Sequence, residues 1–142
     1  MQRYLPLIGR ILIALIFVLS AFGKITDFSG TQQYMASAGM PATGLLLVGA
    51  IVLELFGALS VLLGFRARWG AIALIAFLIP ATLIFHTDFA DQNQMIHFMK
   101  NLSILGGLLF VVAHGSGAFS LDRRLGSSSE KAVATEKEAY AF

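Results

Sequence analysis

The stretch His97-Phe-Met-Lys-Asn-Leu-Ser-Ile-Leu-Gly-Gly-Leu-Leu-Phe-Val-Val-Ala-His114 decides the fold. It begins with polar residues, continues as an apolar run and ends at a second histidine, which is the pattern of a helix that crosses a membrane. Lys100 and Asn101 lie one turn inside its start, where a lysine beside hydrocarbon is costly unless it faces a partner or the interface. Gly106 and Gly107 provide a flat surface on which another helix can lie close. The partner of Lys100 must therefore come from elsewhere in the chain.

The composition places the rest of the chain in the same class. Of the 142 residues, 57% are hydrophobic and 13% are charged, whereas soluble domains carry about 25% charged residues. The charges cluster between long apolar runs, and the length leaves room for about four spans of roughly 20 residues each. We therefore predict one all-α domain, an integral membrane four-helix bundle in the lipid bilayer.

The absence of cysteine narrows the chemistry. With no cysteine, the chain has no disulfide, no thiolate metal site and no cysteine-ligated iron–sulfur cluster. The net charge of +2 is spread over loop ends, so it more plausibly orients the protein in the bilayer than binds nucleic acid. No phosphate loop, dinucleotide fingerprint or nucleophile elbow is present.

Four apolar runs are the predicted spans, at residues 5–25, 43–65, 69–86 and 96–113. The first could instead be a cleaved signal peptide, but its length, the early Arg10 and the bulky Phe22 near the end disfavour cleavage. Residues 26–40 are too polar to span and predict a short interfacial helix between spans one and two. The membrane domain is expected to cover residues 1–124, and residues 125–142 are expected to be a mobile cytoplasmic tail.

The distribution of basic residues sets the expected orientation. Lys24 and Lys100 lie on one side together with acidic loop residues, and six arginines lie on the other. Positive charge favours the cytoplasmic side, so both termini are predicted to be cytoplasmic. The six arginines are Arg3, Arg10, Arg66, Arg68, Arg123 and Arg124.

This topology gathers polar residues in the outer half of the bundle. Glu54 lies near the middle of span two and must be protonated, paired or solvated. We expect it to pair with Lys24 or Lys100, either as a structural contact or as part of a working site. The alternative for the lysines and histidines is that they only extend their polar ends into the headgroup region. The predicted ligand-binding residues are Lys24, Glu54, His86, His97, Lys100 and Asn101.

Two further sets of side chains are candidates for a structural ion pair and for a metal site. Arg10 in span one and Asp122 after span four share the cytoplasmic side and are predicted to form a structural ion pair, although Arg10 could instead extend to the interface. No metal is predicted, because the spacing of His86, His97 and Glu54 carries no ligand signature.

The order of these residues resembles the DoxX family of small bacterial and archaeal membrane proteins. The similarity runs from Leu5 to Arg124, and its motifs are Gly9-Arg10, Gly23-Lys24, Glu54, Lys100-Asn101 with Gly106-Gly107, and Gly117 with Ser120-Leu121-Asp122. The resemblance implies four membrane helices in a bacterial or archaeal inner membrane. The family's namesake is similar to a subunit of an archaeal thiosulfate:quinone oxidoreductase, and a mycobacterial relative is linked to a membrane-associated oxidoreductase complex.

Three functions follow as hypotheses. The first is a redox-associated subunit, accessory to a quinone-linked oxidoreductase, that binds a quinone-like ligand or anchors a partner protein. Lys24, Lys100 or His86 would donate to a quinone carbonyl, with Phe17, Phe22 or Phe56 against the ring, although these rings fit ordinary packing too. The second is a transport protein in which Glu54 titrates. The third is a structural scaffold, whose many small residues permit a homo-oligomer. No covalently bound cofactor is expected.

Overall fold

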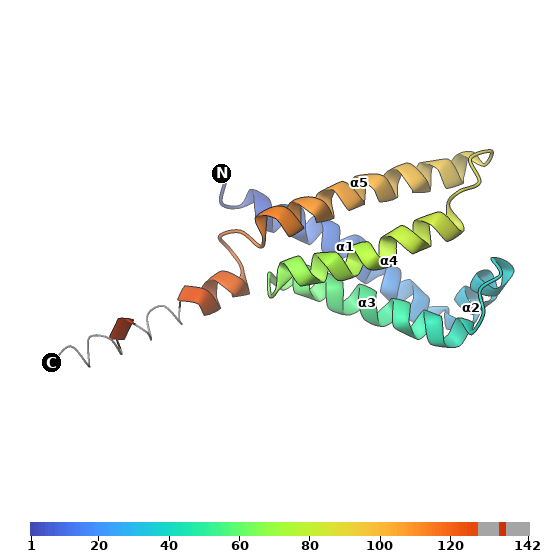
Figure 1. Ribbon diagram of the computed structural model, residues 1–142, viewed down its shortest axis with the longest axis horizontal. Helices are drawn as coiled ribbons and strands as arrows, with labels where there is room; N and C mark the ends of the chain where they lie inside the picture. Colours follow the sequence, from blue (N-terminus) through green and yellow to red (C-terminus); the bar gives the residue numbers. More distant parts are fainter. Residues whose placement is uncertain (128–133, 136–142) are drawn as a thin grey trace.

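The computed structural model describes residues 1–127 and 134–135, and within these the regular structure is helical, with no strand. Four long helices lie side by side, and one short helix covers one end (Figure 1). The four long helices are each long and apolar enough to cross a membrane, which confirms the predicted all-α membrane bundle. The elements are α1 (Leu5–Thr26), α2 (Phe28–Ser37), α3 (Thr43–Leu63), α4 (Ala67–Phe85) and α5 (Gln92–His114).

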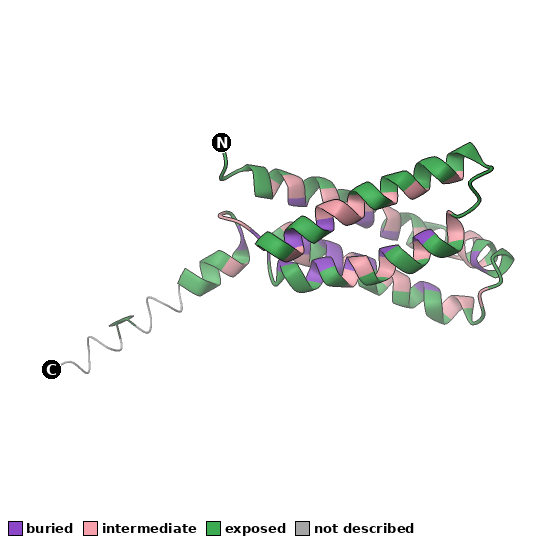
Figure 2. Ribbon diagram, turned by 45° about the horizontal axis from the view of Figure 1, so that its top comes forward, coloured by how far each residue is buried: buried purple, intermediate pink, exposed green. Residues whose placement is uncertain are grey.

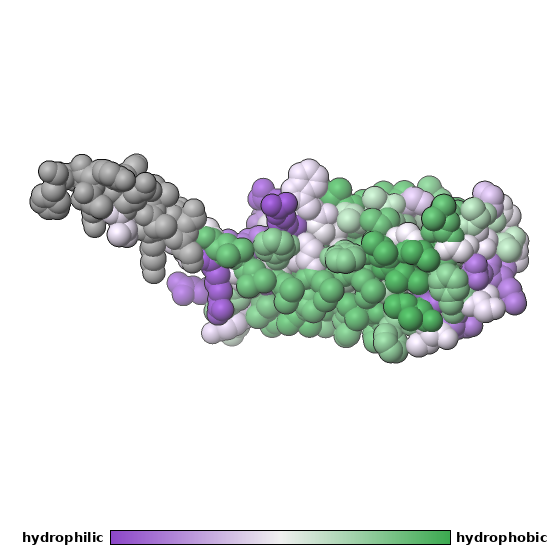
Figure 3. Space-filling model, turned by 90° about the horizontal axis from the view of Figure 1, so that it is seen from below, coloured by the Kyte–Doolittle hydropathy of each residue, from purple (hydrophilic) through white to green (hydrophobic). Residues whose placement is uncertain are grey.

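The surface of the bundle matches this environment. In the space-filling view the side of the bundle is predominantly apolar, and polar residues gather towards its two ends (Figure 3). Large apolar side chains such as Leu45, Phe56 and Phe110 are exposed, which is costly in water and favourable against lipid tails. With an even number of spans, the start of α1 and the end of α5 lie at the same end, which we call the inner end.

The helix boundaries differ from the predicted spans by up to four residues, and local structure explains two of the differences. Helix α5 begins at Gln92 rather than near residue 96, because the Asp91 side chain accepts a hydrogen bond from the Asn93 amide at 2.9 Å and caps the helix. Helix α3 ends at Leu63 because Gly64 follows in a left-handed conformation, with φ of 65°. The predicted tail lies largely outside the described residues.

The tightest packing is in the inner half of the bundle, where buried residues gather (Figure 2). Helices α3 and α4 cross closely there because Gly57 and Gly70 face each other. A Cβ on Gly70 would lie 2.4 Å from the Ser60 hydroxyl oxygen and 2.9 Å from the Gly57 carbonyl oxygen. The buried core comprises Ala14, Phe17, Ala58, Val61, Ala67, Ala71, Leu74, Leu78, Leu108 and Val111.

The glycine pair of α5 is used asymmetrically. A Cβ on Gly107 would lie 2.8 Å from the Cδ1 atom of Ile13 in α1, whereas a Cβ on Gly106 would meet nothing within 4 Å. Gly107 therefore permits the close approach of another helix that the sequence predicted, and that helix is α1, whereas Gly106 faces open space.

Arg10 and Asp122 both lie at the inner end, but the predicted direct ion pair between them is wrong. The buried Arg10 guanidinium donates to the Val61 carbonyl at 3.2 Å and to the Phe119 carbonyl. The Asp122 carboxylate accepts from the Arg66 and Ala67 amides at 2.7 and 3.3 Å, capping α4. Each charged group thus forms hydrogen bonds with backbone groups left open at helix ends. A direct ion pair between Arg10 and Asp122 would leave those backbone groups without partners. The ion pair within 4.0 Å in the described part of the chain is instead Lys24 with Glu54.

Helix α2 covers the opposite, outer end. It begins at Asp27, whose side chain accepts from the Gly30 amide at 3.1 Å, and its Met35 side chain is buried. The ring of Tyr34 stacks on that of Phe85 at the end of α4, with ring centroids 5.1 Å apart. The short helix predicted between spans one and two is present, and it closes part of the outer half of the bundle.

Candidate functional site

A cavity of about 740 Å³ occupies the outer half of the bundle. Its walls come from all five helices and are mostly apolar. The polar side chains that reach it are few, and they include a complete acid–base pair. This combination of an apolar body with a few convergent polar groups is typical of small-molecule sites in proteins. The polar and charged side chains on its walls are Ser20, Lys24, Thr31, Tyr34, Glu54, His86, Lys100 and Asn101.

The deepest charged group of the cavity is Glu54, in the middle of α3. Its residue surface is fully buried, and Gly57 and Val61 follow on the same buried face of the helix. The Lys24 ammonium from the last turn of α1 lies 3.0 Å from Oε2 and 3.2 Å from Oε1 of Glu54. Glu54 Oε2 has no hydrogen-bond donor beyond this ion pair, so the carboxylate depends on Lys24 for its charge balance.

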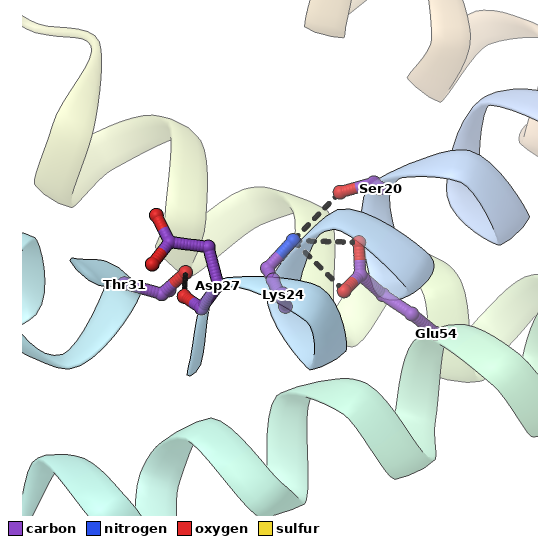
Figure 4. A network of polar contacts seen from close by, with 5 residues as sticks. All are labelled: Ser20, Lys24, Asp27, Thr31 and Glu54. Carbon is purple, nitrogen blue, oxygen red and sulfur yellow. Dashed lines mark hydrogen bonds and ion pairs between the residues drawn. The ribbon is translucent and has the colours of Figure 1, made fainter. Parts of the chain in front are cut away.

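Two other groups hold the Lys24 ammonium in place. It donates to the Ser20 hydroxyl oxygen at 2.6 Å, one helical turn earlier in α1 (Figure 4). It also lies 5.4 Å from the centre of the Phe77 ring in α4, within the range of a cation–π interaction. The side chains of Lys24 and Glu54 point toward each other across the α1–α3 contact (Figure 4), and the Lys24 side chain is 21% exposed. The pair is therefore a positioned hydrogen-bonding group on the cavity wall rather than a surface contact.

Three bases lie at the outer end of the cavity, and we call them the rim cluster: His86, His97 and Lys100. The Lys100 ammonium is 3.0 Å from Nδ1 of His97. The rings of His97 and His86 stack with centroids 5.1 Å apart. Burial lowers the pKa of His86, and the neighbouring His97 and Lys100 lower it further. Burial and the two neighbouring bases therefore both favour the neutral form of His86.

Asn101 takes a different role from the rim cluster. Its amide nitrogen donates to the Thr82 hydroxyl oxygen at 2.9 Å, and the Thr82 hydroxyl donates to the Leu78 carbonyl at 2.7 Å. This chain of hydrogen bonds links α5 to α4 beside the cavity. Asn101 therefore positions the start of α5 while one face of its side chain still reaches the cavity.

The structure brings most of the predicted site residues together. Glu54 pairs with Lys24, one of the two partners that the sequence allowed, and Lys100 contacts His97 instead. His97 is exposed and does not line the cavity itself, but it contacts His86 and Lys100, which do. Of the rings expected beside a ligand, Phe17 lies on the cavity wall, whereas Phe22 and Phe56 are exposed on the lipid-facing surface.

Several site residues were missed in the sequence. Ser20 carried a usable signal, because it precedes Lys24 by four residues and therefore shares its helix face. Phe77 and Thr82 carried none, because their contacts with Lys24 and Asn101 exist only after the helices pack. Among the described residues, no group of three or more histidine, aspartate or glutamate side chains is arranged to hold a metal ion.

The fold and the cavity define a class: a multi-pass four-helix membrane protein with a polar site in its outer half. Comparison with known proteins gives the family. The DoxX family model matches residues 5–87. Two Escherichia coli proteins, inner membrane protein YqjF and inner membrane protein YphA, are each 42% identical, over 84% of this chain and over 90% and 89% of theirs. The chain belongs to the DoxX family and is a multi-pass inner-membrane protein.

A more distant similarity reaches eukaryotes. The ER-derived vesicles protein ERV29 of Saccharomyces cerevisiae is 28% identical over 87% of this chain, which corresponds to 34% of its own length. No solved structure matches this chain significantly.

Proposed function

We propose that this chain is a redox-associated membrane subunit that holds a quinone-like ligand in the outer cavity. The observation that carries the proposal is the Lys24–Glu54 pair on the wall of an otherwise apolar cavity of about 740 Å³. An apolar cavity suits a ring with a lipid tail, and a fixed ammonium group donates well to a carbonyl oxygen. Phe17 of α1 and Phe77 of α4 both line the cavity and supply aromatic surface for a planar ligand.

The pair is also suited to a ligand that changes its proton content. Quinone reduction adds protons to the carbonyl oxygens, and a carboxylate paired with an ammonium offers both an acceptor and a donor at one place. Because the chain has no cysteine, electrons would come from a partner oxidoreductase that docks on the membrane subunit.

Packing favours a binding role over the alternative of transport. The inner half below Glu54 is filled by the buried core and by Arg10, which donates to the Val61 and Phe119 carbonyls. A transported molecule would have to open the close α3–α4 crossing at Gly57 and Gly70. The cavity therefore fits a ligand that enters and leaves through the outer half.

The test uses tryptophan quenching by a short-chain ubiquinone analogue in detergent micelles. The chain has one tryptophan, Trp69 at the start of α4, so the variant Trp69→Phe/Phe85→Trp moves the reporter to the cavity wall. Saturable quenching is expected for this reporter. Adding Lys24→Met/Glu54→Leu should weaken the affinity by about tenfold, the equivalent of one lost hydrogen bond.

Two controls separate binding from partition into the micelle. The parent chain with Trp69 alone should show only linear quenching, because its tryptophan lies far along α4 from the cavity residues. Phe56→Leu on the lipid-facing side of α3 should leave saturation unchanged. Equal affinity with and without the charged pair, or linear quenching throughout, would reject the quinone site.

A further inference from the structure

We propose that the rim cluster, His86, His97 and Lys100, is a binding site for a phosphate group at the outer mouth of the cavity. It is separate from the Lys24–Glu54 pair, and it does not depend on the proposed quinone site. The three side chains come from two elements that meet at this end: His86 caps the end of α4, and His97 and Lys100 lie in the first turns of α5.

The geometry leaves donors free to face a ligand. Because Lys100 donates to Nδ1 of His97 at 3.0 Å, the proton of a neutral His97 ring is assigned to Nε2. The His86 ring stacks on it, and Nδ1 of His86 is buried with no hydrogen-bond partner. An unpaired buried nitrogen is costly, and the Lys100 ammonium, which uses one of its three donors on His97, also interacts electrostatically with the His86 ring.

No carboxylate among the described residues lies within 4.0 Å of the ring nitrogens or the ammonium of the rim cluster. Asp88 and Asp91 lie in the adjoining loop, but their carboxylates accept hydrogen bonds from the Ala90 amide at 3.2 Å and the Asn93 amide at 2.9 Å. Glu54, deeper in the cavity, is paired with Lys24. Two titratable groups of α2 and its cap also lie near this end: the Tyr34 ring stacks on Phe85, and the Asp27 carboxylate accepts from the Gly30 amide at 3.1 Å.

The chemistry favours a phosphate group over a single-point acceptor. Neighbouring basic side chains repel each other when they are charged. An anion with several oxygens can relieve this repulsion, because it accepts hydrogen bonds from all of them at once. Lipid headgroups and inorganic phosphate both offer such oxygens, and the cluster lies at the end of the spanning helices where either could reach it. An anion bound there favours the charged form of each imidazole, so binding takes up protons and strengthens as the pH falls.

The experiment follows the histidine titrations by NMR in the full-length, ¹⁵N-histidine-labelled protein. The chain has three histidines, and His114 at the inner end of α5, stacked on Phe110, is an internal control. One arm adds inorganic phosphate to protein in maltoside micelles, and the other compares those micelles with phosphatidylglycerol nanodiscs. The pKa of His86 and of His97 should rise by roughly one pH unit in at least one arm, as expected for a nearby opposite charge.

Each result is decisive. A rise with inorganic phosphate identifies a soluble anion as a ligand, and a rise only in nanodiscs identifies a lipid headgroup. Lys100→Gln should reduce the rise, whereas Arg68→Gln at the inner end should not. The proposal is overturned if neither arm moves His86 and His97, or if His114 moves equally, which would indicate a general surface potential.

Discussion

Glu54 and Lys24 carry opposite charges but are not equivalent in their surroundings. Glu54 is fully buried in the middle of α3, whereas the Lys24 side chain is 21% exposed near the end of α1. A lysine left alone here can turn its flexible stem toward the outer interface. A carboxylate left alone at Glu54 has no such route, so it must become protonated or remain as an uncompensated buried charge.

This asymmetry predicts unequal effects of neutralising the two residues. Lys24→Met should lower the free energy of unfolding by about 3 kcal/mol, because it removes the partner of a buried charge. Glu54→Gln should cost about 1 kcal/mol, because the amide can still accept from Lys24. Unfolding in mixed detergent micelles, followed by circular dichroism, measures both.

The double variant lacks both charges, so it shows whether the Lys24–Glu54 pair is needed for stability or only for ligand binding. Lys24→Met/Glu54→Leu should return to within about 1 kcal/mol of the parent, since apolar residues often replace a buried ion pair without loss. If Glu54→Gln proves as damaging as Lys24→Met, the assumed freedom of Lys24 is wrong.

At the scale of residues, the sequence predicted which side chains matter better than it predicted the groups that they contact. Glu54 stood out because a charge in the middle of an apolar span needs a partner, and Lys24 was one of two lysines in the right leaflet. Arg10 and Asp122 were placed at the correct end, but their partners are backbone groups of helix ends. Which carbonyls and amides remain open depends on where α3 ends and α4 begins, and that is set by packing rather than by charge pattern.

At the scale of the helices, the positions of glycine residues control how closely two helices approach. The α3–α4 crossing needs Gly70, because a methyl group there would approach the Gly57 carbonyl oxygen at 2.9 Å as well as the Ser60 side chain. Backbone cannot move aside as a flexible side chain can. Gly106 in α5 is the contrasting case, with open space where a Cβ would be.

Gly70→Ala should therefore destabilise the bundle by about 2 kcal/mol through overpacking. Gly106→Ala should be neutral or stabilise by about 0.5 kcal/mol, because alanine favours helix more than glycine does. Thermal unfolding of the two purified variants under the same detergent conditions gives the comparison. Equal melting temperatures would show that the α3–α4 contact tolerates separation.

The helices themselves were largely predictable. Long apolar runs identified the four spanning helices, and the polar stretch after the first identified α2. The error at the start of α5 arose because residues 92–94 are polar, so hydropathy placed the start later than the Asp91 cap does. The asymmetry between Gly106 and Gly107 was not predictable, because neighbouring residues on a helix differ only in the direction they face.

At the scale of the whole molecule, orientation places the cavity and the rim cluster at the outer face. Arginines gather at the inner end, and Lys24, Lys100 and the acidic loop residues lie at the other. This bias predicts that the inner end faces the cytoplasm.

The absence of cysteine makes the orientation simple to test. Asn93→Cys, exposed at the outer start of α5, should react with a membrane-impermeant maleimide in spheroplasts. Gln2→Cys, exposed at the opposite end, should react only after lysis. Labelling of Gln2→Cys in intact spheroplasts would show that the orientation is reversed and that the cavity lies on the cytoplasmic side.

The contact of Arg10 with the Phe119 carbonyl joins residues 109 positions apart. The partners of the Arg10 guanidinium enter the chain in two stages, because the Val61 carbonyl comes with α3 and the Phe119 carbonyl follows α5. The segment that follows α5 also caps α4 through Asp122. The inner end of the bundle is therefore completed only after the four long helices have been made and brought together.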